Sequence, residues 1–205
     1  MRDRFLIVVE GIADETFIRQ YLFHLFGQKV PDNFILRTNG KDNLKSTSAI
    51  NRMRSMTDQG GINLVIFDAD NDFEVRKASI LKWKEENGLE FELFLLPNNK
   101  DKGELEDLLE NIINPNNRPI LDCWEKYEKE LVTIHIEGRT PPPLTTPAKK
   151  TKIYGYLEAL LFESESEKKK IKEREREYDN DLHWNLGAEY LLPLKEFLEK
   201  WISKK

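Results

Sequence analysis

Cysteine and histidine are scarce in this chain. Cys123 is its single cysteine, so no disulfide can form within it, and three histidines at positions 24, 135 and 183 are too far apart in sequence for a Cys/His zinc cluster. No apolar run approaches the roughly 20 residues that span a bilayer, which argues against an integral membrane protein. The first apolar run, residues 5–9, is too short for the core of a secretion signal. We therefore expect a cytoplasmic protein.

The chain also has no excess of positive charge. It carries 32 Lys and Arg against 37 Asp and Glu, a formal net charge of −5. This balance argues against a protein that coats nucleic acid non-specifically, although it leaves room for a local basic patch. The 205 residues, of which 39% are hydrophobic, suffice for one main domain with one core.

Apolar runs alternate with helical patterns through the first half of the chain. The first and the third of these runs are continuous, as in strands that are buried on both faces of a parallel sheet. Strands are expected near residues 4–10, 34–36, 62–67 and 91–96. Helices are expected after Gly11 up to Gly27, and over about 44–56, 73–87 and 105–112. The pattern predicts an α/β, Rossmann-like domain over about residues 1–115, with a parallel sheet of about four strands flanked by helices.

The remaining residues, 116–205, change in character. Helical spacing of apolar residues is found around 121–131, 149–162 and 193–202, with a proline-rich link at 140–147. Residues 163–181 mix acidic and basic side chains at high density, which favours a solvated helix or a mobile loop over a nucleic-acid-binding arm. We expect a helical extension that packs on the α/β domain.

Acidic residues follow two of the predicted strands. Glu10 ends the first, and Asp68, Asp70 and Asp72 follow the third. Ligands of open α/β sheets bind at the carboxyl ends of the strands, and alternate residues of an extended chain share a side, so Asp68 and Asp70 can converge. Carboxylates gathered without His or Cys suit Mg²⁺ or Mn²⁺. The alternative is an ordinary polar turn, with Asp14 acting only as a helix cap.

Several familiar motifs are absent. The sequence contains no Gly-rich Lys-Ser/Thr phosphate loop and no GxGxxG, so binding of ATP or a dinucleotide by those means is not expected. An EF-hand loop starting at Asp68 would need Gly and Glu where the chain has Phe73 and Ser79.

The remaining pattern is a strand with Glu-Gly, followed about sixty residues later by a strand with Asp-x-Asp. Residues 8–11 (Val-Val-Glu-Gly) and 66–72 (Ile-Phe-Asp-Ala-Asp-Asn-Asp) resemble the Toprim domain of topoisomerases, bacterial primases and OLD-type nucleases. The resemblance implies that Glu10 acts in acid/base chemistry or holds metal, and that Asp68 and Asp70 hold Mg²⁺, with Asp72 as a further candidate. Asp14 matches a second acid of the OLD-type branch. Gly11 leaves room for a phosphate or an ion to approach the backbone.

A closer resemblance is to a small Toprim-like group with the domain label DUF3226. It is carried by Leu96-Pro97 with residues 103–109, by residues 150–154, and by residues 183–186 ahead of Pro193-Leu194. Glu106 borders the apolar stripe of its helix and can reach the same sheet edge as a metal ligand; alternatively, it is an exposed helix acid. Lys150 or Lys152 could neutralise a phosphate as a catalytic lysine; alternatively, both are solvated.

These resemblances imply a Toprim-like nuclease. The expected activity is Mg²⁺- or Mn²⁺-dependent phosphodiester hydrolysis on DNA or RNA, since no tyrosine lies in a context that suggests strand passage. The alternative is a non-catalytic metal-binding or protein-interaction module in a nucleic-acid-processing or defence complex. Because OLD-type nucleases combine a Toprim domain with an ATPase, a separately encoded ATPase is an expected partner, and a second copy of the chain is another.

Overall fold

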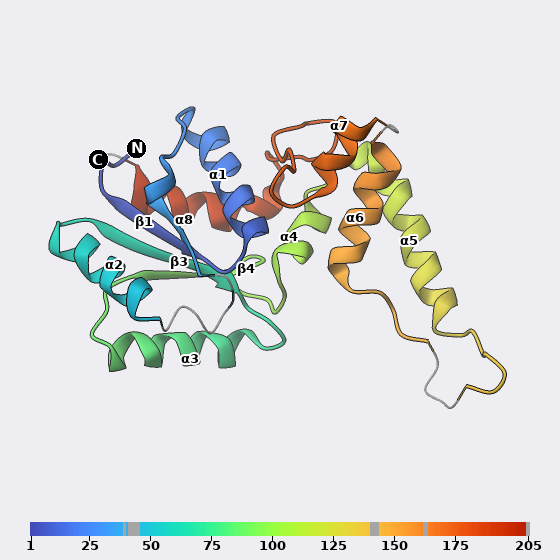
Figure 1. Cartoon of the computed structure of the whole chain (residues 1–205), viewed down its shortest axis with the longest axis horizontal. Coiled ribbons are helices and arrows are strands. Elements are labelled where there is room, and N and C mark those ends of the chain that lie inside the picture. Colours follow the sequence, from blue (N-terminus) through green and yellow to red (C-terminus); the bar gives the residue numbers. More distant parts are fainter. Residues whose placement is uncertain (39, 41–45, 140–143, 162–163, 204–205) are drawn as a thin grey trace.

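The computed structural model describes residues 1–38, 40, 46–139, 144–161 and 164–203. Its centre is a sheet of four parallel strands in the order β2-β1-β3-β4 (Figure 1). The strands are β1 (Phe5–Val9), β2 (Ile35–Arg37), β3 (Ile62–Asp68) and β4 (Glu92–Leu96). The expected α/β fold with a four-stranded parallel sheet is therefore confirmed.

The two central strands are buried on both faces. All five residues of β1 and the middle five residues of β3 are buried, which explains why both segments are apolar in the sequence, apart from the hydrogen-bonded Asn63 within β3. Phe5 pairs with Ile62, and Val9 pairs with Ile66. This register brings the carboxyl ends of β1 and β3 to the same edge of the sheet.

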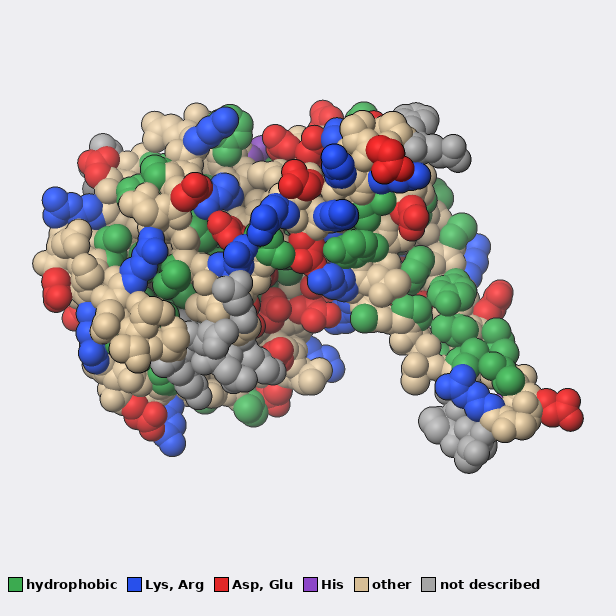
Figure 2. Space-filling view, viewed as in Figure 1, with side chains coloured by type: hydrophobic (Ala, Val, Ile, Leu, Met, Phe, Trp, Pro, Cys, Tyr) green, Lys and Arg blue, Asp and Glu red, His purple; other side chains and the backbone are tan. Residues whose placement is uncertain are grey.

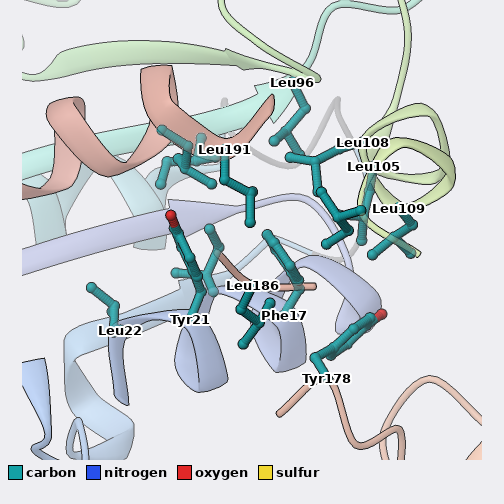
Figure 3. Packing of buried hydrophobic residues seen from close by; sticks show 14 of the residues in the cluster. Phe17, Tyr21, Leu22, Leu96, Leu105, Leu108, Leu109, Tyr178, Leu186 and Leu191 are labelled. Carbon is teal, nitrogen blue, oxygen red and sulfur yellow. The ribbon is translucent and has the colours of Figure 1, made fainter. Parts of the chain in front are cut away.

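Helices cover both faces of the sheet (Figure 1). Alternate residues of β1 point to opposite faces, so Phe5, Ile7 and Val9 join one apolar cluster whereas Leu6 and Val8 join another. The first cluster is completed by α1 (Ile12–Phe26) and α8 (Leu192–Ile202), and the second by α2 (Thr47–Asp58) and α3 (Phe73–Glu86). Figure 3 shows part of the first cluster, in which side chains from α1, β4, α4 and the segment before α8 occupy one space.

The helix boundaries follow local capping chemistry. Gly27 ends α1 in the left-handed conformation, with φ of 64°, as the glycine in the sequence suggested. Asp72 begins α3, because its side chain accepts a hydrogen bond from the backbone N–H of Val75. The helix expected from residue 44 begins at Thr47 behind the cap Ser46; residues 44 and 45 lie outside the described part of the chain.

The C-terminal half adds further helices beside the sheet (Figure 1). They are α4 (Leu105–Asn111), α5 (Arg118–Leu131), α6 (Lys149–Leu160) and the short α7 (Glu165–Lys168), with 3-10 turns at Asp32–Phe34, Pro115–Asn117, Lys169–Ile171 and Glu189–Leu191. We refer to α5 and α6 together as the arm. Gly155 of α6 permits their close approach, because a Cβ atom there would meet the Trp124 ring at 2.4 Å. Of the proline-rich link, residues 140–143 lie outside the described part.

The charged segment is not simply solvated. Within it, Arg176 is 2% exposed and Tyr178 is fully buried, although most of the neighbouring charged residues are exposed or half-buried. Tyr178 packs edge-on against Phe17 of α1, with ring centroids 5.2 Å apart. The expectation of a solvated helix or mobile loop is therefore wrong for these two residues. The reason is that an aromatic side chain, Tyr178, lies among the charged residues and packs into the core. Residue 163 lies outside the described part.

Across the described ranges, none of the helices combines the length and the apolar character that a membrane span requires.

We predict that α8 is needed for the stability of the whole sheet. Leu198 is fully buried in the cluster that contains β1 and α1, so Leu198→Ala is expected to lower the free energy of unfolding by about 2–5 kcal/mol. Leu192 of the same helix is 49% exposed and provides a matched control, for which the loss is expected to be small. Urea denaturation measures both, and equal losses in the two variants would contradict the assignment.

Candidate functional site

Acidic side chains surround a cavity at the carboxyl edge of the sheet. Its volume is about 250 Å³, and we call it the acidic cavity. Its walls are Glu10, Gly11, Ile12, Ala13, Asp14, Gly40, Asp68, Leu105, Glu106, Lys150 and Glu173. Figure 2 shows Asp and Glu side chains gathered where the sheet ends, beside the arm. The structure thus brings together four of the predicted acids, namely Glu10, Asp14, Asp68 and Glu106.

The turn from β1 into α1 supplies the first two acids. The Gly11 N–H donates a hydrogen bond of 2.7 Å to Oδ2 of Asp14, and a Cβ atom on Gly11 would lie only 3.1 Å from that oxygen. The missing side chain of Gly11 therefore makes room for the Asp14 carboxyl. Burial raises the pKa of Asp14 to about 7; the Gly11 N–H opposes this rise, and the charges of Glu10 and Glu106 add to it.

Asp68 is the last residue of β3, and its carboxyl faces α4. Its Oδ1 accepts a hydrogen bond of 2.9 Å from the backbone N–H of Leu105, at the start of that helix. Burial raises the pKa of Asp68 well above its usual value, and the charges of Asp14, Glu10 and Glu106 raise it further. Several carboxyls are therefore held close together here with little solvent, which favours their protonated forms.

Glu106 enters the cavity from the first turn of α4. Its pKa is raised by burial, whereas the positive charges of Arg176 and Lys150 lower it. Lys150 lines the cavity as well, and its ammonium pairs with the carboxylate of Glu173. Of the two predicted lysines, Lys150 is thus placed at the acids, already in an ion pair.

Arg76 neutralises part of this edge, and sequence reasoning missed it. Its side chain is 16% exposed and pairs with Glu10 at 2.7 Å and with Asp70 at 3.5 Å. Its Nε also donates a hydrogen bond of 3.3 Å to the backbone carbonyl of Asp68. Burial raises the pKa of Glu10, and the Arg76 guanidinium opposes that rise. The sequence did offer one signal for Arg76, namely its position. It lies one helical turn after Asp72, the cap of α3, and this spacing directs its side chain back toward the end of β3.

Three predicted residues lie outside the acidic cavity. Asp70 has a φ of 55°, so the chain is no longer extended there and Asp70 does not share the side of Asp68; its carboxyl pairs with Arg76. Asp72 caps α3. Lys152 is 7% exposed and binds Glu110 of α4 at 2.9 Å and Glu128 of α5 at 3.6 Å, so it joins three helices.

Arg176 is a second cation that the sequence did not reveal. Its guanidinium lies 5.2 Å from the ring centroid of Tyr154 and 5.7 Å from that of Tyr178, and its Nε is buried without a hydrogen-bond partner. Among the described residues it forms no ion pair with a carboxylate, although its charge lowers the pKa of Glu106 across the site. The only sign in the sequence that this region is buried was the aromatic residue at position 178, which lies within a run of charged residues.

The donor chemistry of the acidic cavity suits Mg²⁺ or Mn²⁺. Its acidic groups are all carboxyls, the oxygen ligands that these hard cations prefer. The raised pKa values of Asp14 and Asp68 indicate that too little positive charge lies beside these carboxyls to favour their ionised forms. In the described part of the chain, however, no three His, Cys, Asp or Glu side chains are grouped so that they could hold a metal ion. Metal binding would therefore require carboxyls such as those of Asp14 and Asp68 to turn away from the backbone N–H groups whose hydrogen bonds they now accept.

One family model matches residues 4–202, from β1 to the end of α8. The chain belongs to the DUF3226 family. The family is described as a protein of unknown function, and the match confirms the resemblance to it. Comparison of this DUF3226 chain with curated proteins and with solved structures found no match. The family match includes α4, the arm and α8 as well as the sheet, so every wall of the acidic cavity lies within it.

We predict that the acidic cavity lowers stability at neutral pH when no metal is bound. Between about pH 4 and pH 7 the unfolded chain loses the Asp14 proton while the folded chain keeps it, so the free energy of unfolding falls as the pH rises. The fall is ~1.4 kcal/mol for each unit by which the folded and unfolded pKa values differ. Asp14→Asn has no such proton and should flatten this part of the profile.

Urea denaturation across that pH range in EDTA measures the effect. Asp72→Asn is the matched control, because Asp72 is an exposed cap whose Asn replacement also caps helices. An identical pH profile in wild type and Asp14→Asn would show that the cavity does not hold Asp14 in its protonated form.

Proposed function

We propose that this protein is a Toprim-like, Mg²⁺- or Mn²⁺-dependent nuclease that hydrolyses phosphodiester bonds of DNA or RNA. The observation that carries the proposal is the acidic cavity, in which Glu10, Asp14, Asp68 and Glu106 come from three separate segments to one edge of a parallel sheet. Such an edge is where α/β sheets bind their ligands. Carboxyls that raise one another's pKa at such a place are typical of functional sites.

The Toprim resemblance supports the same proposal. The two segments that carry it, Glu10-Gly11 and the run after Phe67, end strands β1 and β3, which are neighbours in the sheet. These two segments are about sixty residues apart in the sequence, yet they lie on adjacent strands of the sheet. By this resemblance Asp68 would hold the metal, joined by Asp14 and Glu106 from the other walls of the cavity.

The bound cation would polarise a phosphoryl oxygen and stabilise the charge that develops during in-line displacement. The chain's own groups prepare for this step. Asp68 and Asp14 would exchange their protons for the cation, because a positive charge lowers the raised pKa values of both carboxyls. Lys150, at the cavity wall, would place its ammonium against the phosphate once Glu173 releases it.

Glu10 is proposed as the general base or acid. Its backbone is fixed at the end of a buried strand, and its raised pKa brings it closer to the pH at which proton transfer is efficient. Arg76 holds one carboxylate oxygen at 2.7 Å and so orients the group. The other oxygen would accept a proton from water or donate one to the leaving oxygen.

A non-catalytic module is the second candidate. The observation in its favour is that the acids already have partners: Glu10 pairs with Arg76, Asp14 binds the Gly11 N–H, and Asp68 binds the Leu105 N–H. On this view the acids brace the sheet edge against α1 and α4 for an interaction partner. The separately encoded ATPase stays a prediction under either candidate.

Metal binding should be visible as added stability. A cation that binds the folded chain alone raises its melting temperature by mass action. We predict that millimolar Mn²⁺ raises the melting temperature of the wild type and that Asp68→Asn abolishes the rise. Asp122→Asn, an exposed acid of α5 paired with Arg118, is the control and should respond as the wild type does. Differential scanning calorimetry measures the melting temperature. If Mn²⁺ leaves the melting temperature of the wild type unchanged, the proposed metal site is wrong.

Catalysis is tested by Glu10→Gln, which keeps the shape of the side chain and loses its titratable proton. Cleavage of a labelled oligonucleotide in Mn²⁺ should fall by about 10²–10⁴-fold in single-turnover experiments, while folding and the metal-induced rise in melting temperature persist. Glu86→Gln, at the exposed end of α3, is the matched control. If the wild type binds Mn²⁺ but never cleaves, the non-catalytic module is the function.

A further inference from the structure

A second cavity lies between the 3-10 turn that precedes α5, the end of α6 and the charged segment. Its volume is about 340 Å³, within the range of sites that hold small organic ligands. We call it the asparagine pocket; it is lined by Asn114, Asn116, Asn117, Leu160, Leu161, Glu167, Lys170, Asn180, Leu182 and His183. His183 begins one of the runs that carry the family resemblance, residues 183–186, for which the sequence indicated no role.

The backbone of His183 is held firmly, but its ring has no partner. The His183 carbonyl accepts hydrogen bonds from the Tyr156 hydroxyl at 2.5 Å and from the Asn114 N–H at 2.8 Å. The residue is only 8% exposed, yet within the described ranges its imidazole makes no hydrogen bond and no ion pair. Buried polar groups normally have a partner. Since this ring belongs to the wall of a cavity, a ligand in the cavity could supply one.

The charge state of the ring fixes what it can offer. Burial lowers the pKa of His183, so the imidazole is neutral at neutral pH. A neutral imidazole has one nitrogen that donates and one that accepts. The ring therefore suits an uncharged ligand that has both donors and acceptors.

Other residues of the pocket also keep unused hydrogen-bonding atoms in the described part of the chain. Asn117 donates to the Tyr156 hydroxyl at 2.9 Å and to the Leu182 carbonyl at 2.7 Å, whereas its Oδ1 accepts no hydrogen bond. Asn180 accepts the Leu182 N–H at 3.1 Å, whereas its Nδ2 donates to no group. The Glu167 carboxylate has neither an ion pair nor a hydrogen bond. Acceptors thus outnumber donors among these three unused groups.

This set of groups favours a flat molecule with polar edges over an ion. Lys170 is the one cation among the described lining residues, and it already pairs with Glu177 at 2.9 Å, so a phosphate would find little free positive charge. No three metal-binding side chains of the described chain are grouped to hold a metal ion. Leu160 and Leu161 add apolar surface at the end of α6. Apolar faces with hydrogen-bonding edges are the features of a nucleobase.

We propose that the asparagine pocket binds a nucleobase that carries an exocyclic amino group, such as adenine. The amino group would donate to the free acceptors of Glu167 and Asn117, and a ring nitrogen would accept from His183 or from Asn180. Uracil and thymine have a carbonyl oxygen where adenine and cytosine have the amino group. The Glu167 carboxylate would repel that oxygen, so the pocket discriminates against these two bases.

A base in a strand and a free nucleoside present the same chemistry to this pocket. Lys170 lines the asparagine pocket and Glu173 lines the acidic cavity, and three residues of chain span at most about 11 Å. This proximity favours an unpaired base of a strand whose phosphodiester lies in the acidic cavity. That choice of source rests on the proposed function, whereas the binding of a base does not.

Binding is measured on the full chain in EDTA. Isothermal titration calorimetry compares adenosine with uridine, and fluorescence anisotropy compares fluorescein-labelled single-stranded oligoadenylate with oligouridylate. We expect the adenine ligand to bind at least tenfold more tightly than the uracil ligand of the same kind, because the site would leave polar groups unpaired against uracil. Oligoadenylate that binds more tightly than adenosine identifies a strand as the source. Adenosine that binds while oligoadenylate does not identifies a free nucleoside.

Two variants test the residues. His183→Leu has a similar size and lacks both ring nitrogens, so binding of the adenine ligand should weaken about tenfold; the exposed His135→Leu is its control and should bind as the wild type does. Glu167→Gln keeps the shape of the side chain and removes the repulsion, so the preference for adenosine over uridine should fall. Its control is Glu165→Gln, an exposed acid of the same short helix that lies outside the pocket.

Three results would each overturn the proposal: no binding of either adenine ligand, equal affinity for adenine and uracil ligands, and variants that equal their controls. Because the assay contains no metal, its outcome is separate from that of hydrolysis. A chain that binds oligoadenylate through His183 but does not cleave in Mn²⁺ keeps the base site and rejects the nuclease. A chain that cleaves in Mn²⁺ but binds no base here keeps the nuclease and rejects the base site.

Discussion

The parallel pairing of β1 with β3 is the constraint on which the rest of the structure depends. Strands buried on both faces require cover on both sides, and this requirement fixes α1 and α8 on one face and α2 and α3 on the other. The same pairing aligns Val9 with Ile66, so that Glu10 and Asp68 leave the sheet at one edge. Position at that edge, rather than proximity in sequence, makes the acidic cavity.

The fold could be predicted from the sequence because its signals are local. Apolar runs, Gly27 and the Asp72 region mark strands and helix ends within a few residues of where they are. Glu10 and Asp68 of the acidic cavity could be predicted because both lie at the ends of strands, whose positions the apolar runs indicate. Asp70 could not be placed by the alternation rule, since the backbone turns to a φ of 55° one residue after the buried Ala69. Arg76 and Arg176 were missed because their roles depend on contacts across the fold.

The acidic edge is held together against its own repulsion. Removing carboxyls from water and setting them beside one another raises their pKa values, and the protein limits the effect with cations and backbone N–H groups. Arg76 compensates at Glu10, and Arg176 acts on Glu106 from within a packed aromatic setting. The compensation is partial, which leaves an edge that gains from any further positive charge.

The position of α8 in the core has a consequence for synthesis on the ribosome. Phe94 of β4 packs against Phe197 of α8, with ring centroids 5.3 Å apart, yet about a hundred residues separate the two in the chain. At roughly 5–20 residues per second, translation needs on the order of 5–20 s to deliver the helix after the strand has emerged. Throughout that interval the part of this apolar face that α8 covers in the folded chain is exposed, although α1 has already been made. The emerging chain therefore presents a hydrophobic surface to chaperones until its final helix arrives.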